Sequence, residues 1–278
     1  MFAVEDIFVK QAIFAFMIIF LLYPPGTSRA DDGDSQAINW ALQNSLGAGV
    51  YIGDKENAKI YKLPLSYTFR DINEAGWALK FTLPVTIGIY DIKTTGGDID
   101  LDVTSVVPGI ELQIPLQDDW LFIPFAGFGA GKDISGGEER YLYSLGIKHY
   151  VFSRWKSLDF TMGNTLRVDG FSAKGGGRDG SITSLDAGLD TRLPIGFKFS
   201  RNPGYLSFYG VIRHYFNGTV SLYTEEKKFG TRDQVEFGIT LSTIPSWKIW
   251  GLSIDRLGIG YRSGDRISTV RLVFGMPF

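Results

Sequence analysis

The chain of 278 residues carries 28 Lys and Arg against 30 Asp and Glu, a net charge of −2, and contains no cysteine. The balanced charge argues against nucleic acid as a partner, because such binding needs a basic patch. Without cysteine there is no disulfide, thiol catalysis or thiolate metal site, and two histidines (His149 and His214) are too few for a histidine-rich one. We therefore expect neither a metal nor a cofactor. Thirty-four glycines and 14% aromatic residues favour an all-β protein with many turns.

The first segment of the chain is typical of a secretory signal. Residues 12–23 read AIFAFMIIFLLY, a run too short to span a bilayer, which takes about 20 apolar residues. Lys10 precedes the run, and Ser28 and Ala30 supply small residues for cleavage. We predict a cleaved signal peptide over 1–30, with a buried N-terminal helix as the alternative.

Residues 31–45 form a short segment before the first strand, for which two structures are open. Asp34 or Ser35 could cap a helix that lies in or under a barrel lumen as a plug. Neighbouring turns of such a helix would present Ala37, Trp40, Ala41 and Asn44. Alternatively, Ile38, Trp40 and Leu42 alternate and could extend the first strand.

From residue 46 onward, large apolar residues recur at every second position, which is the period of a β-strand. In 76–91, for example, the apolar series Trp77, Leu79, Phe81 alternates with Ala78, Lys80 and Thr82. The pattern predicts twelve strands, at 46–53, 59–69, 76–91, 99–115, 119–131, 139–152, 156–169, 182–198, 204–217, 231–244, 252–263 and 266–278. We interpret a slip of the alternation near 104–106 as a β-bulge. The stretch 120–131 is apolar at both parities and has no predicted orientation.

The apolar series is predicted to face lipid rather than a core between two sheets. The segments are longer than most strands of soluble proteins, which cluster near five or six residues. The alternation also continues to the last residue, with Val270, Leu272, Phe274, Met276 and Phe278 on one face. The predicted fold of 46–278 is therefore a closed 12-stranded antiparallel transmembrane β-barrel.

Loop lengths and aromatic residues predict how this barrel lies in its membrane. The connections after even-numbered strands are mostly short, whereas those after odd-numbered strands include 170–181 and 218–230. Short periplasmic turns and long external loops are typical of outer-membrane barrels, so both mature termini are expected in the periplasm. Five tryptophans are expected in an interfacial belt at the short-turn end: Trp77, Trp120, Trp155, Trp247 and Trp250.

Charged residues share the parity opposite to the apolar series and are predicted to line the lumen. They are Lys62, Lys80, Glu111, Lys148, Asp159, Arg167, Asp169, Asp186, Asp190, Arg192, Arg213, Glu236, Arg262 and Arg271. Two interpretations are open: an ion-paired network that fills the barrel, which we favour, or a selectivity-tuned pore. Strand number does not decide, because twelve lies between filled eight-stranded barrels and open sixteen-stranded ones.

Twelve strands, a helix-capable N-terminal segment and the closing sequence RLVFGMPF resemble the translocator domain of autotransporters. The resemblance covers about residues 34–278 and is greatest to solitary β-domains of Gram-negative bacteria that have no passenger. It implies a structural or transport role in the outer membrane without catalysis, and insertion by the outer-membrane assembly machinery, with Phe278 in the assembly signal. The other expected partners are outer-membrane lipids and lipopolysaccharide, and we favour a monomer.

Two further functions remain as alternatives. A lipid hydrolase, of the phospholipase or lipid A deacylase type, needs a nucleophile beside an oriented base, and the candidate pair is His214 with Thr191 on the neighbouring strand. Outer-membrane phospholipases would imply a His-x-Ser motif, which neither His149 nor His214 provides. A surface adhesin would use the loops 170–181 and 218–230.

Overall fold

The computed structural model describes residues 39–53, 56–72, 76–94, 97–134, 137–174, 179–199, 202–216, 231–249, 252–265 and 267–278. The predicted signal peptide, Asp34, Ser35 and Trp250 lie outside these residues. The described elements are α2 (Trp40–Ser45), β1 (Gly49–Gly53), β2 (Glu56–Arg70), β3 (Ala78–Thr94), β4 (Gly97–Val106), β5 (Gly109–Gln117), β6 (Trp120–Asp133), β7 (Glu139–Trp155), β8 (Leu158–Ala173), β9 (Gly180–Phe199), β10 (Asn202–Tyr215), β11 (Asp233–Ile249), β12 (Leu252–Gly264) and β13 (Ile267–Phe274).

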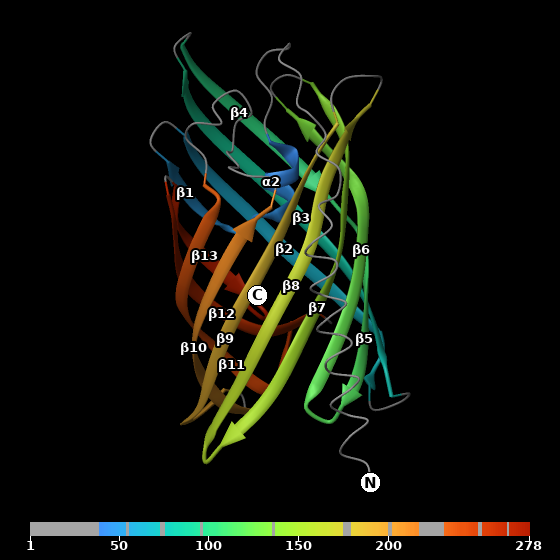
Figure 1. Cartoon of the computed structure of the whole chain (residues 1–278), viewed down its shortest axis with the longest axis vertical. Coiled ribbons are helices and arrows are strands. Elements are labelled where there is room, and N and C mark those ends of the chain that lie inside the picture. Colours follow the sequence, from blue (N-terminus) through green and yellow to red (C-terminus); the bar gives the residue numbers. More distant parts are fainter. Residues whose placement is uncertain are drawn as a thin grey trace. The chain divides into compact units, whose positions relative to one another are not determined.

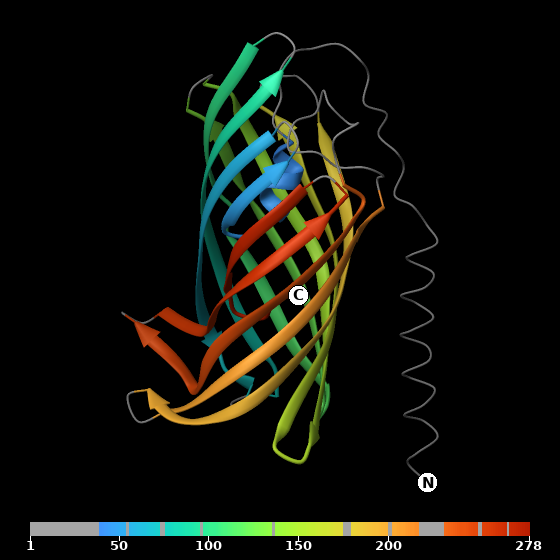
Figure 2. The ribbon, with the colours of Figure 1, turned by 90° about the vertical axis from the view of Figure 1, so that its left-hand side faces the viewer.

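Antiparallel pairing joins these strands into one sheet that closes on itself (Figures 1 and 2). The closure is made by β1, which pairs with β2 on one side and with β13 on the other. β4 and β5 together occupy one position in the wall, because both pair with β3 and with β6. The thirteen segments therefore form a closed 12-stranded barrel, which confirms the predicted fold class.

The interruption between β4 and β5 is not a bulge. Val106 pairs with Val85 of β3 and Ala130 of β6, and Gly109 pairs with Thr82 and Gly127 of the same strands. The spacing between the two partners on each neighbouring strand equals the spacing between Val106 and Gly109, so no residue is inserted. The predicted bulge at 104–106 is therefore wrong. Pro108 has no N–H to donate, which breaks the hydrogen-bond ladder while the alternation continues, with Val106 exposed and Val107 buried.

The outer wall is apolar and the inner face is polar. Large side chains such as Phe69 and Phe237 are 64% and 65% exposed, while threonines, aspartates and arginines of the opposite parity are buried. In the stretch 120–131, which the sequence did not orient, Phe128 points outward, whereas Ile123 of the opposite parity is buried, so that the inner face is apolar here. A soluble sandwich would bury its apolar series between sheets. The outward apolar face therefore confirms the interpretation of the alternation.

α2 lies within the ring of strands (Figure 2), where it packs against β7, β8 and β9. Its N-cap is Asn39, whose Oδ1 accepts a hydrogen bond from the amide of Leu42 at 3.0 Å. All residues from Trp40 to Leu46 are buried. Of the two structures left open for this segment, the helix is therefore correct, although it is capped at Asn39 rather than at Asp34 or Ser35. No helix in the described part of the chain is long and apolar enough to cross a membrane.

The end of the chain departs from the prediction. β13 ends at Phe274, and Gly275 adopts φ 74°, a left-handed conformation that favours glycine and ends the strand. The following residues turn inward, so that the C-terminus lies inside the ring in both views (Figures 1 and 2). Val270 and Leu272 face outward as expected, but Phe278 is only 6% exposed. Uninterrupted alternation to the last residue was therefore a wrong prediction.

Candidate functional site: the filled lumen

Every charged residue predicted to line the lumen lies on the inner face and is buried or half-buried. These residues are Lys62, Lys80, Glu111, Lys148, Asp159, Arg167, Asp169, Asp186, Asp190, Arg192, Arg213, Glu236, Arg262 and Arg271. Strand register brings most of them into pairs of opposite charge. Among the described residues, no group of three or more His, Asp or Glu side chains is arranged to hold a metal ion.

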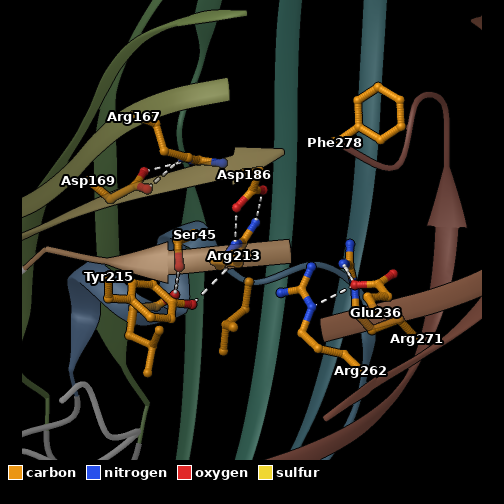
Figure 3. A network of polar contacts seen from close by, with 12 residues as sticks. Ser45, Arg167, Asp169, Asp186, Arg213, Tyr215, Glu236, Arg262, Arg271 and Phe278 are labelled. Atoms are coloured by element: carbon orange, nitrogen blue, oxygen red, sulfur yellow. Dashed lines mark hydrogen bonds and ion pairs between the residues drawn. The ribbon is translucent and has the colours of Figure 1, made fainter. Parts of the chain in front are cut away.

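Glu236 is the centre of the most buried ion cluster (Figure 3). Its Oε2 accepts from Arg262 Nε at 2.6 Å and from Arg271 Nη1 at 2.5 Å, and its Oε1 accepts from the hydroxyl of Tyr209 at 2.8 Å. A Cβ at Gly260 would lie 2.1 Å from that hydroxyl, so glycine is needed there for the close approach. Two arginines therefore share one carboxylate that is 1% exposed.

A second pair lies directly across neighbouring strands. Asp186 and Arg213 are register partners, and both carboxylate oxygens accept from the guanidinium at 2.5 Å. Such two-point contacts are among the strongest charged hydrogen bonds in proteins. Arg256 forms a comparable ion pair with Asp190 at 2.7 Å. Arg256 is not among the residues predicted to line the lumen, although it shares the inward parity of Arg262 and could have been found from that parity.

α2 is tied to the charged wall by polar contacts of its last turn. Asn44 Nδ2 donates to Asp169 Oδ1 at 3.0 Å, and Asp169 also pairs with Arg167. Lys62 Nζ donates to the main-chain oxygens of Asn44 and Leu46 at 2.9 and 3.0 Å. The helix is therefore fixed in the lumen by β2 and β8, a role of Asn44 that its sequence pattern did not indicate.

The apolar residues of α2 close the same level of the lumen. Trp40 is 1% exposed and belongs to a buried cluster with residues from strands around the ring, including Leu142 and Tyr215. A Cβ on Gly131 would lie 2.5 Å from the Trp40 ring, so this glycine makes room for it. The helix thus occupies the barrel interior at the end of the barrel where β8 and β10 finish.

The other level of the lumen is occupied by the inward-turned chain end. Gly163 and Gly188 are register partners, and a Cβ on either would lie 2.2–2.3 Å from the Phe278 ring. The hydroxyl of Tyr150 donates to the main-chain oxygen of Phe278 at 2.9 Å, and the two rings meet edge to face. Two facing glycines therefore form a niche for Phe278, which the sequence did not predict.

The side chains of three of the five predicted belt tryptophans are described. Trp77, Trp120 and Trp155 lie beside the β2–β3, β5–β6 and β7–β8 connections, at the same end of the barrel. Trp155 is 61% exposed, whereas Trp120 is buried and packs edge to face against His149. Trp247 lies in β11 near the β11–β12 connection, where it pairs with Ile254, but its side chain is not described, and Trp250 lies outside the described residues. The Trp155 side chain is therefore exposed at the barrel surface, whereas the Trp120 side chain is covered.

The predicted pairing of His214 with Thr191 is wrong. His214 pairs with Leu185 and Asp233, whereas Thr191 pairs with Phe208, about 20 Å further along the strand. The β9–β10 turn is tighter than expected, and an irregularity at Pro203/Tyr205 shifts the register further. His214 Nδ1 instead lies 2.7 Å from Asp233 Oδ1. The two proposed catalytic groups therefore do not meet.

Taken together, the ring of strands, the apolar exterior and the polar interior define a transmembrane β-barrel of the outer-membrane type. The structure is similar to the β-domain of the Bordetella autotransporter BrkA, with a TM-score of 0.54 and 10% identity over 83% of this chain and 96% of that one. It is also similar to LpxR from Salmonella typhimurium, with 11% identity over 81% and 90% of the two chains, but a TM-score of 0.44 is too low to carry an argument. No family model and no curated protein sequence matches the chain. The barrel thus has the fold of an autotransporter β-domain, and at 10% identity the likeness concerns the fold alone.

Proposed function

We propose that the protein is an integral barrel of the Gram-negative outer membrane whose lumen is closed, with a structural or transport role and no catalytic step. The observation that carries the proposal is the combination of an apolar outer wall with a lumen filled at two levels, by α2 around Trp40 and by the chain end around Phe278. Ion pairs such as Glu236 with Arg262 occupy part of the space between, beside a cavity of about 640 Å³. This arrangement supports the filling network over the open pore.

The proposal includes an orientation and a set of partners. The N-terminal signal and the short turns favour periplasmic mature termini, with membrane lipids and lipopolysaccharide around the wall and a single copy as the working unit. The assembly machinery would act on the last strand and on the residues that follow it, including Phe278, before the chain end turns into the lumen. The aromatic residues beside the short turns support the interfacial belt at the periplasmic side.

We expect the full-length protein to fractionate with outer membranes, to change gel mobility on heating, and to be electrically silent in planar bilayers. The silence follows because α2 and the chain end obstruct the lumen from both sides of the ion-pair network. Steady conductance by the unaltered protein would favour the selectivity-tuned pore. Recovery in the soluble fraction would contradict the membrane proposal itself.

The lipid-hydrolase alternative makes a separate prediction about His214. This side chain faces outward beside Asp233, and no hydroxyl is among its hydrogen-bond partners in the described part of the chain. We expect His214→Ala to leave lipid composition and barrel stability unchanged, measured by lipid mass spectrometry and by heat-modifiable gel mobility. A loss of lipid turnover in this variant, with normal folding, would favour the hydrolase. The adhesin alternative depends on loops 170–181 and 218–230, most of whose residues are not described.

A further inference from the structure

The barrel wall is incompletely paired on one side. β1 joins β2 to β13, but it pairs with only Asn57–Ile60 of β2 and with Ile267–Arg271 of β13. The rest of β2, from Tyr61 to Arg70, pairs with β3 alone among the described residues. Between this edge and Leu252–Arg256 of β12, which have no partner on β13, the wall has a stretch without strand pairing among the described residues; β2 and β12 approach each other across it, and we call it the seam.

The main-chain direction of Pro64 supports the seam. The amide of Val107 donates to Pro84 O at 3.3 Å, so the main-chain groups of Pro84 face β4 and β5. In antiparallel pairs the exchanging and non-exchanging positions alternate, so Pro64, the β2 partner of Pro84, turns its own groups toward the seam. Proline within a sheet is typical of an edge strand because it has no N–H to leave unpaired. The β2 sequence therefore fits an edge at this point.

An open edge is costly in hydrocarbon, where each unpaired main-chain group costs several kcal/mol, but it is tolerated where it lines a water-filled cavity. A cavity of about 640 Å³ lies at the seam. Its lining includes residues 62–66 of β2 and the chain-end residues Phe274, Gly275, Met276 and Phe278. This volume is in the range of pockets for small ligands. The cavity thus reaches the wall where the wall lacks pairing.

The cavity has one apolar side and an excess of cationic groups. Its apolar lining includes Leu121, Ile123, Phe125, Met276 and Phe278. Among the described residues that line the cavity, the cations are Lys62, Lys80, Lys148 and Arg167, and the one acid is Glu111. Within this set Lys148 pairs with Glu111, and Arg167 pairs with Asp169 outside the cavity. The balance favours an anion.

Lys62 is the cation best placed for a ligand. Its ammonium carries three N–H donors, and two of them are used by the main-chain oxygens of Asn44 and Leu46. No carboxylate of a described residue forms an ion pair with it. One donor therefore remains for a group in the cavity, at a point where the seam and α2 meet.

We propose that the seam admits an anionic single-chain amphiphile from the membrane into this cavity, with its carboxylate or phosphate on Lys62 and its acyl chain along Leu121, Ile123 and Phe125. The proposal rests on the membrane location given under the proposed function. It explains why an apolar surface and an ammonium that forms no ion pair with a carboxylate of the described residues share one space inside the barrel. A fatty acid and a lysophospholipid both carry an anionic group and a single acyl chain, so both meet this description.

The test uses the full-length barrel in a non-ionic detergent and native mass spectrometry with dodecanoate, dodecyl phosphate and uncharged monododecanoylglycerol. We expect the two anions to bind at least tenfold more tightly than the neutral lipid, because a hydrogen bond to a charged group contributes about 1.5–3 kcal/mol. Lys62→Met should weaken the binding of the two anions about tenfold. Lys59→Met is the matched control, since it removes the same charge from the exposed face of β2 and should change nothing.

Leu121→Trp provides a second variant that leaves Lys62 and α2 untouched. By filling the acyl side of the cavity, this substitution should weaken the binding of all three probes. This result does not depend on whether the Lys62→Met variant folds. A preference for dodecanoate points to a fatty acid and a preference for dodecyl phosphate to a lysophospholipid, and both support the proposal. Equal binding of the neutral lipid, binding of inorganic phosphate as tight as that of dodecyl phosphate, or unchanged binding in both variants would overturn it. A correctly inserted barrel that binds none of the probes overturns this inference but leaves the membrane assignment intact.

Discussion

Replacing Glu236 by glutamine is expected to destabilise the barrel by about 3–5 kcal/mol, because removal of one partner from a buried ion cluster leaves uncompensated charge. Arg262 and Arg271 both contact Oε2 of this carboxylate. In the variant the two guanidinium groups would face each other across a neutral amide, with the Arg262 side chain only 2% exposed. The effect is therefore larger than the loss of a single hydrogen bond.

The measurement is the denaturant midpoint at which the heat-modifiable, folded gel band is lost. The matched control is Glu139→Gln, which also removes a carboxylate with two cationic neighbours, Lys132 and Lys174. These groups lie at the exposed rim, where ion pairs contribute little because water screens them. We expect no measurable shift for this control. An equal shift for both variants would show that the interior cluster is not what stabilises the barrel.

Removing α2 is expected to turn a silent barrel into a conducting one. Trp40 fills the lumen near Gly131 and Leu142, and Asn44 holds the last turn of the helix against Asp169. Replacing residues 39–45 by a glycine-serine linker of equal length keeps the chain connected but withdraws the ring and the amide. Ion flow should then appear as discrete steps in planar bilayers, limited by the chain end and the ion pairs that remain.

A variant with Phe278→Ala separates the two levels of obstruction. Alone it should leave the barrel silent, because α2 still closes the other level; combined with the linker replacement it should raise the conductance of each step. Circular dichroism in the far ultraviolet must show the same β-sheet signal for all variants. If the folded linker variant stays silent, the ion-pair network rather than α2 is the barrier.

The charged interior could be predicted residue by residue, but its partners could not. Parity along each strand places Glu236 and Arg262 on the inner face, since side chains alternate between faces with a period of two. Parity carries no information about which residues of neighbouring strands lie opposite one another. That depends on register, and the pairing of His214 with Leu185 rather than Thr191 shows how one tight turn and one local irregularity move it.

The chain end illustrates the same limit in another way. Alternation alone placed Phe278 on the outer face with Val270 and Leu272, whereas Gly275 ends the strand and the ring enters the niche at Gly163 and Gly188. Those glycines lie on β8 and β9, far from Phe278 in sequence. No local pattern near residue 278 could have indicated them, because the niche exists only once the barrel has closed.

The sequence by itself determined the class of this protein: the number of strands, the faces of most of them, and which charged residues point inward, because these follow from a period of two and from the exclusion of polar groups from an apolar exterior. The tertiary structure alone decided how the interior is filled and where the wall is weakest. The helix at Trp40, the shared carboxylate of Glu236 and the unpaired edge of β2 all depend on contacts between distant strands. Closure of the ring fixes these contacts, and local preferences do not encode the register at which the ring closes.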